Sequence, residues 1–457
     1  MWKYLNSFRK LFFIFWFISG CITPQKKESF NFMPEFYRDD IKKSLDVDTL
    51  VTEIKAAKDI NLLQSEPEKY SGGYFFRYLN PGKNSRLLSE YKTKNIWEVK
   101  WRAELDPTLF PWFLLFGDDR IIVQNESGWQ MFDTSGKFIM SSSKSDGNLS
   151  IDIKNKLFYQ NDFTGFLAAN NLVTGENEFF IYPYFGQGYD RNLIWYNEHK
   201  FLCIGYEIPV MTHKSTPKEP DITLFEILDV RDKSMIDSDK ILNSAQQVQK
   251  LILKATNVKT AFAGDNIIAV SDDFISVIDI NLNIKKLFHG KFVPVELSID
   301  EQLNISLIVR IDNEDGTFKF FLWLINKNGE LINDTELPVE NKNQEFCPPV
   351  PDFNLNTFII TGNRLFFIDS KGEIKWERFL ADISPGASVS TNGYLLTSEG
   401  NYLNAFDING ERNFIFNFES EKLYSPPLLT PQNEIFVATQ NFLYCLKIKE
   451  YRLLFHG

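Results

Sequence analysis

The sequence predicts an all-β protein, a β-propeller of four-stranded antiparallel blades, with eight blades favoured and seven as the alternative. Three observations support this: short apolar runs separated by polar turns, a repeat interval near 40 residues, and 15% aromatic residues, which suit sheets packed face to face. At 457 residues the chain is long enough for one large all-β domain or two ordinary ones.

The repeat is easiest to recognise in three C-terminal segments. They read NRLFFIDSKGEIKWERF from Asn363, NYLNAFDINGERNFIF from Asn401 and NFLYCLKIKEYRLLF from Asn441. Each is an apolar run, a polar turn and a second apolar run, as a tight hairpin requires. In the first two, an aspartate closes the first run and a glycine follows three residues later: Asp369 with Gly372, and Asp407 with Gly410. Lys447 takes the place of the aspartate in the third.

A proline landmark lies upstream of each segment. Pro348, Pro385 and Pro426 precede the three turn positions by 21, 22 and 21 residues. Because proline cannot donate to a strand ladder, it fits where a strand begins or an edge is unpaired. Each unit is therefore predicted to contain a proline-led strand, a central apolar strand, the strand that ends at the turn position, and its hairpin partner.

The same turn position can be followed back along the chain. The steps between successive positions are 38, 58, 50, 47, 43, 38 and 40 residues, close to the interval of a propeller blade. Asp229 and Asp279 carry the weakest signals, which is why seven blades is the alternative. The eight positions are Asp133, Asn171, Asp229, Asp279, Asn326, Asp369, Asp407 and Lys447.

Inserted segments account for the longer steps. Residues 206–221 are charged and contain prolines, and are expected to form an extended hairpin loop. Residues 244–255 have apolar side chains at helical spacing after Ser244, and predict a short helix at the edge of the propeller. An Asp-Gly turn within residues 311–318 predicts a long β-hairpin.

A propeller must also pair its first and last edges. Residues 95–105 are similar to the outer strand at 372–380, and Trp101 precedes Pro111 much as Trp376 precedes Pro385. We therefore expect the first propeller strand to complete the last blade, although residues 451–455 could also fill that place.

The N-terminus has the features of a secretory signal. Eight apolar residues, 11–18, follow Lys3, Arg9 and Lys10, too few for a spanning helix. The sequence Ile-Ser-Gly-Cys ending at Cys21 resembles the bacterial lipobox, which implies cleavage of residues 1–20 and lipidation of Cys21. We expect residues 21–94 to form a tether with short helices, and residues 95–457 to form the propeller.

Charge and cysteine content limit the function. The formal charge of −11 becomes −14 without the three cations of the signal, which argues against a nucleic-acid partner. Beyond Cys21 there are only three cysteines, Cys203, Cys347 and Cys445, which is no disulfide framework. Sequence does not decide whether two of them pair.

Residues that could carry chemistry are scattered. The four histidines and three acidic pairs lie apart from one another, and the acidic stretch 312–316 lacks the distal glutamate of a calcium loop. No catalytic residue, metal ligand or cofactor-binding residue is predicted. The histidines are His199, His213, His289 and His456, and the acidic pairs are Asp39-Asp40, Asp118-Asp119 and Asp272-Asp273.

The repeat resembles quinoprotein-type (PQQ-like) propeller repeats. The resemblance rests on the Ser-Pro strand start, the EIFVAT and LNAFD strands and the KGEIKW turn, and covers residues 340–457 well and 96–340 loosely. Among lipoproteins, this repeat resembles that of the BamB family of outer-membrane assembly propellers. The adjacent cysteines expected beside the cofactor of a quinoprotein enzyme are absent from the sequence.

Two functional hypotheses follow. The first is a lipid-anchored, non-enzymatic propeller of the bacterial envelope, in the outer membrane because Ile22 rather than Asp follows Cys21, that contacts another envelope protein. Its setting would be outer-membrane protein assembly or envelope maintenance, on the periplasmic face or at the cell surface. The alternative is a periplasmic quinoprotein-like enzyme or ligand sensor that uses the central channel.

Overall fold

The computed structural model describes most of residues 90–449. The predicted signal, Cys21 and nearly all of the predicted tether lie outside the described residues, as do residues 450–457. Within 90–449 the residues left undescribed are 93–95, 107–112, 118, 125–127, 143–148, 153–156, 162–166, 182–191, 198–199, 207–222, 230–245, 254–257, 264–265, 273, 280–282, 301 and 431.

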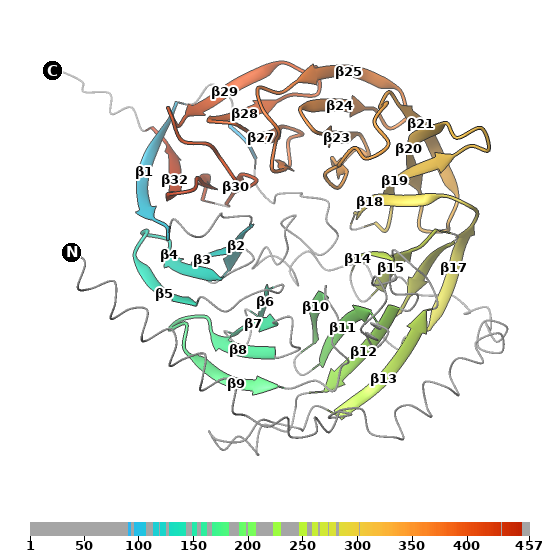
Figure 1. The fold of residues 1–457 in the computed structure, drawn as a ribbon. Coiled ribbons are helices and arrows are strands. Elements are labelled where there is room, and N and C mark those ends of the chain that lie inside the picture. The colour runs from blue at the N-terminus through green and yellow to red at the C-terminus, as the bar shows by residue number, and fades with distance from the viewer. Residues whose placement is uncertain are drawn as a thin grey trace, which may run out of the picture. The chain divides into compact units, whose positions relative to one another are not determined.

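The described residues form eight four-stranded antiparallel sheets, arranged as the blades of a ring (Figure 1). The eight-blade prediction is therefore confirmed. Blades one to four contain β2 (Phe113–Gly117), β3 (Arg120–Gln124), β4 (Trp129–Asp133) and β5 (Phe138–Ser142); β6 (Leu149–Asp152), β7 (Leu157–Asn161), β8 (Leu167–Asn171) and β9 (Asn177–Ile181); β10 (Asn192–Asn197), β11 (Lys200–Tyr206), β12 (Thr223–Asp229) and β13 (Gln246–Leu253); and β14 (Lys259–Ala263), β15 (Asn266–Val270), β16 (Phe274–Ile278) and β17 (Ile284–His289).

The remaining blades include the best-defined repeats of the sequence. Blade eight joins three C-terminal strands to β1, the first strand of the chain. Blades five to eight contain β18 (Val293–Ile299), β19 (Ile305–Asp312), β20 (Phe318–Ile325) and β21 (Leu331–Leu337); β22 (Val350–Pro351), β23 (Thr357–Thr361), β24 (Arg364–Ile368) and β25 (Ile374–Phe379); β26 (Ala387–Val389), β27 (Leu395–Glu399), β28 (Tyr402–Phe406) and β29 (Arg412–Asn417); and β30 (Leu428–Leu429), β31 (Glu434–Ala438), β32 (Phe442–Ile448) and β1 (Trp97–Glu104).

The repeated aspartates shape the turn between the third and fourth strands of a blade. In blade six, one carboxylate oxygen of Asp369 accepts the backbone N–H groups of Lys371 (3.0 Å) and Glu373 (2.9 Å). Gly372 lies in the left-handed region at φ +83°, which favours glycine. Asp407 makes the same bonds in blade seven, which is why the Asp-to-Gly spacing recurs in the sequence.

Each turn glycine also supports contact between blades. The Trp376 indole of blade six lies on Gly410 of blade seven, so closely that a Cβ at Gly410 would be 2.9 Å from the ring, and its Nε1 donates to the Ile408 carbonyl at 2.9 Å. In blade five, Thr335 donates to the Gly372 carbonyl at 2.8 Å. The outer strand of one blade thus docks on the third-to-fourth-strand turn of the next.

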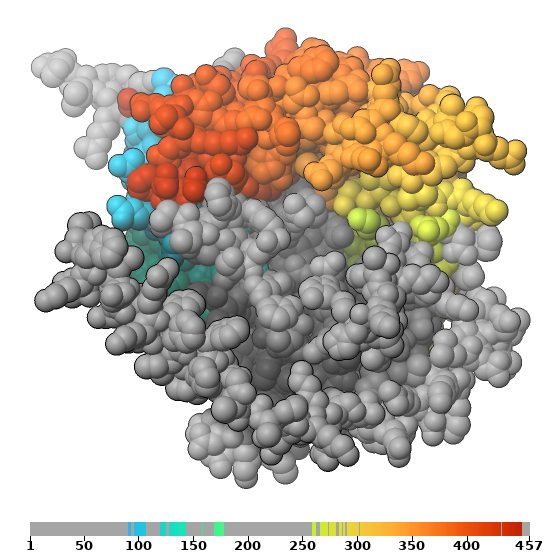
Figure 2. Space-filling model, viewed as in Figure 1, coloured from blue at the N-terminus to red at the C-terminus, as the bar shows by residue number. Residues whose placement is uncertain are grey.

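The first strand of the ring closes the last blade, as predicted. β1 pairs antiparallel with β32 from Trp97–Ile448 to Glu104–Phe442, and it lies beside the C-terminal strands in Figures 1 and 2. Trp101 faces Cys445 in this ladder, while its Nε1 donates to the Thr134 carbonyl of blade one at 2.9 Å. A single strand therefore completes blade eight and docks it on blade one.

One sequence prediction is wrong. Residues 244–255 were expected to form a short helix, but Gln246–Leu253 is the strand β13, paired along the whole of β12. An apolar pattern this short fits the periodicity of a helix and that of a strand equally well. The open edge of β12 favours the strand, because it supplies backbone hydrogen-bond partners that an isolated helix would not have. The expected long hairpin is confirmed by β19 and β20, and residues 451–455 lie outside the described part.

Trp101 and Gly136 give a direct test of ring closure. The Gly136→Ala substitution is expected to lower the free energy of unfolding by about 3 kcal/mol, because it adds a clash to the cost of a left-handed alanine. The added Cβ would lie 2.6 Å from the Trp101 ring. Unfolding in urea, followed by tryptophan fluorescence, measures the loss.

The matched control is Gly316→Ala in the β19–β20 turn. Gly316 has nearly the same φ, +81°, but nothing lies within 4 Å of the added Cβ. Only the backbone cost of about 1 kcal/mol is expected. Equal losses for the two variants would mean that the contact between Trp101 and Gly136 does not stabilise the ring.

Candidate functional site on blades six and seven

The residues considered from sequence do not meet in one place. Cys21, His199, His213 and His456 lie outside the described residues, and His289 ends β17. Asp315 accepts the Thr317 backbone N–H and hydroxyl in a solvated hairpin turn, which agrees with the prediction for residues 312–316. In the described part of the chain, no three His, Cys, Asp or Glu side chains are grouped so as to hold a metal ion.

The most exposed large apolar side chains of the described residues are on blades six and seven. Phe379 is 69% exposed, Ile383 64% and Phe414 59%. Phe379 ends the outer strand β25, Ile383 lies in the connection from β25 to β26, and Phe414 is on the outer strand β29. We call these three residues the apolar knobs.

The connection that carries Ile383 is held at both ends. At its start, Leu380 donates its backbone N–H to the Asn363 carbonyl (2.8 Å), and Ala381 donates to the carboxylate of Glu399 (3.2 Å). At its end, the Ser384 hydroxyl donates to the Gly386 carbonyl at 2.9 Å. Ile383 is therefore presented on a braced loop.

Glu399, at the end of β27, is the buried centre of this brace. Its side chain is fully buried, and it accepts hydrogen bonds from Thr397 (2.8 Å) and Asn404 (3.1 Å). Arg412 of the outer strand β29 pairs with its other oxygen at 2.6 Å. A buried carboxylate requires such partners, so Glu399 joins the connection, two inner strands and the outer strand of blade seven.

A second ion pair joins this connection to the next. Asp382 and Lys422, from the connections after blades six and seven, are 2.7 Å apart. The Lys422 ammonium holds the pKa of Asp382 below its ordinary value. The Asp382 side chain also lies against Gly400. Two residues later, on β28, the Tyr402 ring packs edge-on against the Phe414 ring, with 5.9 Å between the ring centroids. The residues beside Ile383 and Phe414 are thus charge-paired and ordered by contacts.

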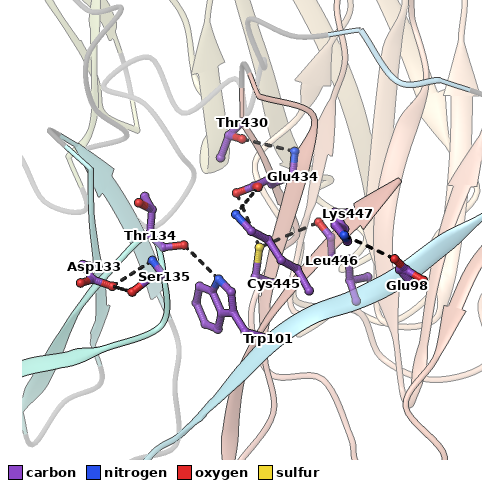
Figure 3. A network of polar contacts seen from close by, with 11 residues as sticks. Glu98, Trp101, Asp133, Thr134, Ser135, Thr430, Glu434, Cys445, Leu446 and Lys447 are labelled. Carbon is purple, nitrogen blue, oxygen red and sulfur yellow. Dashed lines mark hydrogen bonds and ion pairs between the residues drawn. The ribbon is translucent and has the colours of Figure 1, made fainter. Parts of the chain in front are cut away.

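The ring-closing seam contains the other polar network (Figure 3). Glu434 pairs with Lys100 of β1 at 2.5 Å, and the Cys445 thiol donates to its second oxygen at 3.7 Å. Burial, and then the Glu434 charge, raise the pKa of the Cys445 thiol far above its ordinary value. A thiolate nucleophile is disfavoured here, and the network serves to hold β1.

No sequence pattern marks the Glu399 brace. Its members are spread over residues 381–412 and share no motif, so only the fold brings them together. A different signal could have been found: DEQLN at 300–304 and DFNLN at 352–356 form matching turns between first and second strands. In both, the aspartate accepts the N–H of the last asparagine, at 2.8 and 2.9 Å.

Comparisons with solved structures find the propeller fold. A quinohemoprotein alcohol dehydrogenase from Comamonas testosteroni is 8% identical with a TM-score of 0.54, over 88% of this chain and 85% of that one. Sqt1 from Saccharomyces cerevisiae is 10% identical with a TM-score of 0.50, over 80% and 100%. BamB from Moraxella catarrhalis is 12% identical with a TM-score of 0.48, over 78% and 99%.

These similarities concern the fold alone. At about 10% identity, likeness of fold does not decide between the two functional hypotheses. No family model matches the sequence, and no curated protein is recognisably similar to it. Among the described residues no helix is long and apolar enough to cross a bilayer.

The Glu399 brace predicts unequal effects of two Glu→Gln substitutions. Glu399→Gln removes the buried partner of Arg412 and is expected to cost about 2 kcal/mol of unfolding free energy. Glu377→Gln, which breaks the 2.6 Å pair with Arg364 at the surface, should cost under about 1 kcal/mol. Urea unfolding of both variants measures the difference, and a larger loss for Glu377→Gln would contradict the brace.

The burial of Cys445 predicts that its thiol is protected from reagents while the ring is closed. The pKa of the Cys445 thiol is higher in the folded state than in the unfolded state. The protonated thiol therefore contributes to the free energy of unfolding at pH values below its ordinary pKa, and this contribution is lost as the pH rises above about 9. In the Cys21→Ser, Cys203→Ser, Cys347→Ser background, where Cys445 is the one remaining cysteine, a disulfide reagent at pH 8 should label Cys445 only after unfolding. Fast labelling of the folded protein would show that β1 does not cover it.

Proposed function

We propose that this protein is a lipid-anchored propeller of the bacterial envelope that acts by contact with another protein. The observation that supports contact is the set of apolar knobs, Phe379, Ile383 and Phe414. They are the most exposed large apolar residues of the described chain, and a loop braced by a buried carboxylate presents one of them. Exposed apolar side chains on an ordered frame are typical of interaction sites.

The chemistry of the surface indicates the kind of partner. Arg364, Arg412 and Lys422 near the knobs each have a carboxylate partner, and Arg378, beside Phe379, donates to backbone carbonyls and lies over the Trp376 ring. Aromatic and aliphatic knobs with a paired polar rim fit an apolar protein surface. The partner is therefore a protein with an exposed apolar patch, and outer-membrane protein assembly or envelope maintenance is the proposed setting.

Site-specific photocrosslinking in cells tests the contact. The full chain carries p-benzoylphenylalanine in place of Ile383 or Phe414, with the Phe138 position of blade one as the control, since Phe138 is also exposed. One discrete crosslinked protein at 383 and 414, and none at 138, is expected. The same adducts at all three positions, or none at the knobs, would contradict the proposal.

The lipid anchor is tested separately. Labelled palmitate should be incorporated by the wild type and by Cys347→Ser, and lost in Cys21→Ser. Incorporation that persists in Cys21→Ser would remove the anchor from the proposal without affecting the contact surface.

The alternative function gives a different outcome in a ligand experiment. A quinoprotein-type enzyme or sensor would show a higher melting temperature with pyrroloquinoline quinone and Ca²⁺ together. The contact function expects no such shift, and a saturable shift with both ligands would favour the enzyme.

A further inference from the structure

Residues just before β1 bind to a different blade from the one that β1 completes. The Asn392 side chain, in the β26–β27 turn of blade seven, accepts the backbone N–H of Tyr91 at 3.0 Å and donates to its carbonyl at 2.8 Å. One amide side chain thus pairs with both backbone groups of Tyr91, as a neighbouring strand would.

The Tyr91 ring is also held. It is almost completely buried, lies parallel to Trp97 with centroids 6.2 Å apart, and contacts Tyr394 of blade seven at 5.3 Å. Burial raises the pKa of its hydroxyl to about 12. Tyr91 belongs to an apolar cluster that includes residues of blades seven and eight, such as Leu396 and Leu443.

Asn392 is positioned for this role before Tyr91 arrives. Its Oδ1 accepts the Ser390 hydroxyl at 2.7 Å, and the turn is closed by Gly393, whose N–H donates to the Ser390 carbonyl at 3.0 Å. The amide is therefore part of an ordered turn and needs little rearrangement to bind the strand.

The position of this contact matters because of how β1 can open. β1 and β32 are antiparallel; Trp97–Ile448 is the first pair of their ladder, and just upstream the Lys449 N–H donates to the Ile96 carbonyl at 2.7 Å. A free upstream end would let the ladder fray one pair at a time from Trp97, which is the least costly way to detach an edge strand. Detachment would also remove Trp101 from blade one and open the ring.

We propose that the contact of Tyr91 with Asn392 is a clasp that keeps the ring closed, by fixing the upstream end of β1 to blade seven. The clasp stops fraying where it would begin. Where the N-terminal segment is tethered to a membrane, which rests on the proposed function, the clasp passes a pull on that segment to blade seven instead of to the Trp97–Ile448 pair.

Hydrogen exchange of the whole chain, read by mass spectrometry, tests the clasp. Asn392→Ala removes both bonds, and Asn392→Asp keeps the acceptor for the Tyr91 N–H but loses the donor. We expect β1 amides to exchange about 10-fold faster in Asn392→Ala, and less so in Asn392→Asp, because each lost bond weakens the closed state. Amides of β23 and β24 in blade six should be unchanged.

The control is Asn409→Ala, in the β28–β29 turn of blade seven, whose side chain bonds only Asp407 among the contacts described. Its β1 exchange should match the wild type. Unchanged β1 exchange in Asn392→Ala would overturn the proposal, as would equal acceleration in every blade. The milder Asn392→Asp keeps the test valid if Asn392→Ala does not fold.

The mechanical part has its own measurement. An optical-tweezers pull between the N-terminus and a cysteine at Glu340 should show a lower first rupture force in Asn392→Ala than in the wild type. Equal rupture forces in the two proteins would mean that the clasp has no mechanical role. If Cys21 is not lipidated, the tether fails, but the exchange experiment still decides the clasp.

Discussion

The whole ring depends on how one strand, β1, joins its two ends. Every other blade is made of four strands consecutive in sequence, but blade eight needs a strand from the opposite end of the chain. β1 supplies backbone partners to β32 and an indole to the Gly136 turn of blade one. Because unpaired edges are costly, the energy of closure is concentrated in this strand and in the residues that hold it.

The repeated residues and the unique residues have different roles. The aspartates and glycines that recur shape turns and accept the outer strand of the neighbouring blade, so they account for the scaffold. In the described part of the chain, the apolar knobs, the Glu399 brace and the Tyr91 clasp have no counterpart that recurs from blade to blade. A rigid repeated frame lets individual blades vary, and the residues that depart from the repeat are where function is expected.

Sequence patterns predicted the features that depend on local chemistry. The pairs Asp369 with Gly372 and Asp407 with Gly410 could be predicted because a turn with left-handed backbone accepts few residue types. Trp101 could be matched to Trp376 because both lie in similar outer-strand sequences that precede a proline. The prediction of a helix at 244–255 was wrong because the apolar spacing fits a helix and a strand equally well. Pairing with the edge of β12 selects the strand. Glu399 was missed since none of its partners is marked in sequence.

By itself the sequence determined the turns and the repeat interval, and favoured eight blades over seven, because these features depend on residues close together in the chain. Only the tertiary structure decided that Tyr91 binds blade seven, that Cys445 is buried beside β1, and that Phe379, Ile383 and Phe414 remain exposed. The physical reason is distance along the chain. Burial and hydrogen bonding between residues some 300 positions apart depend on closure of the ring, which no local pattern records.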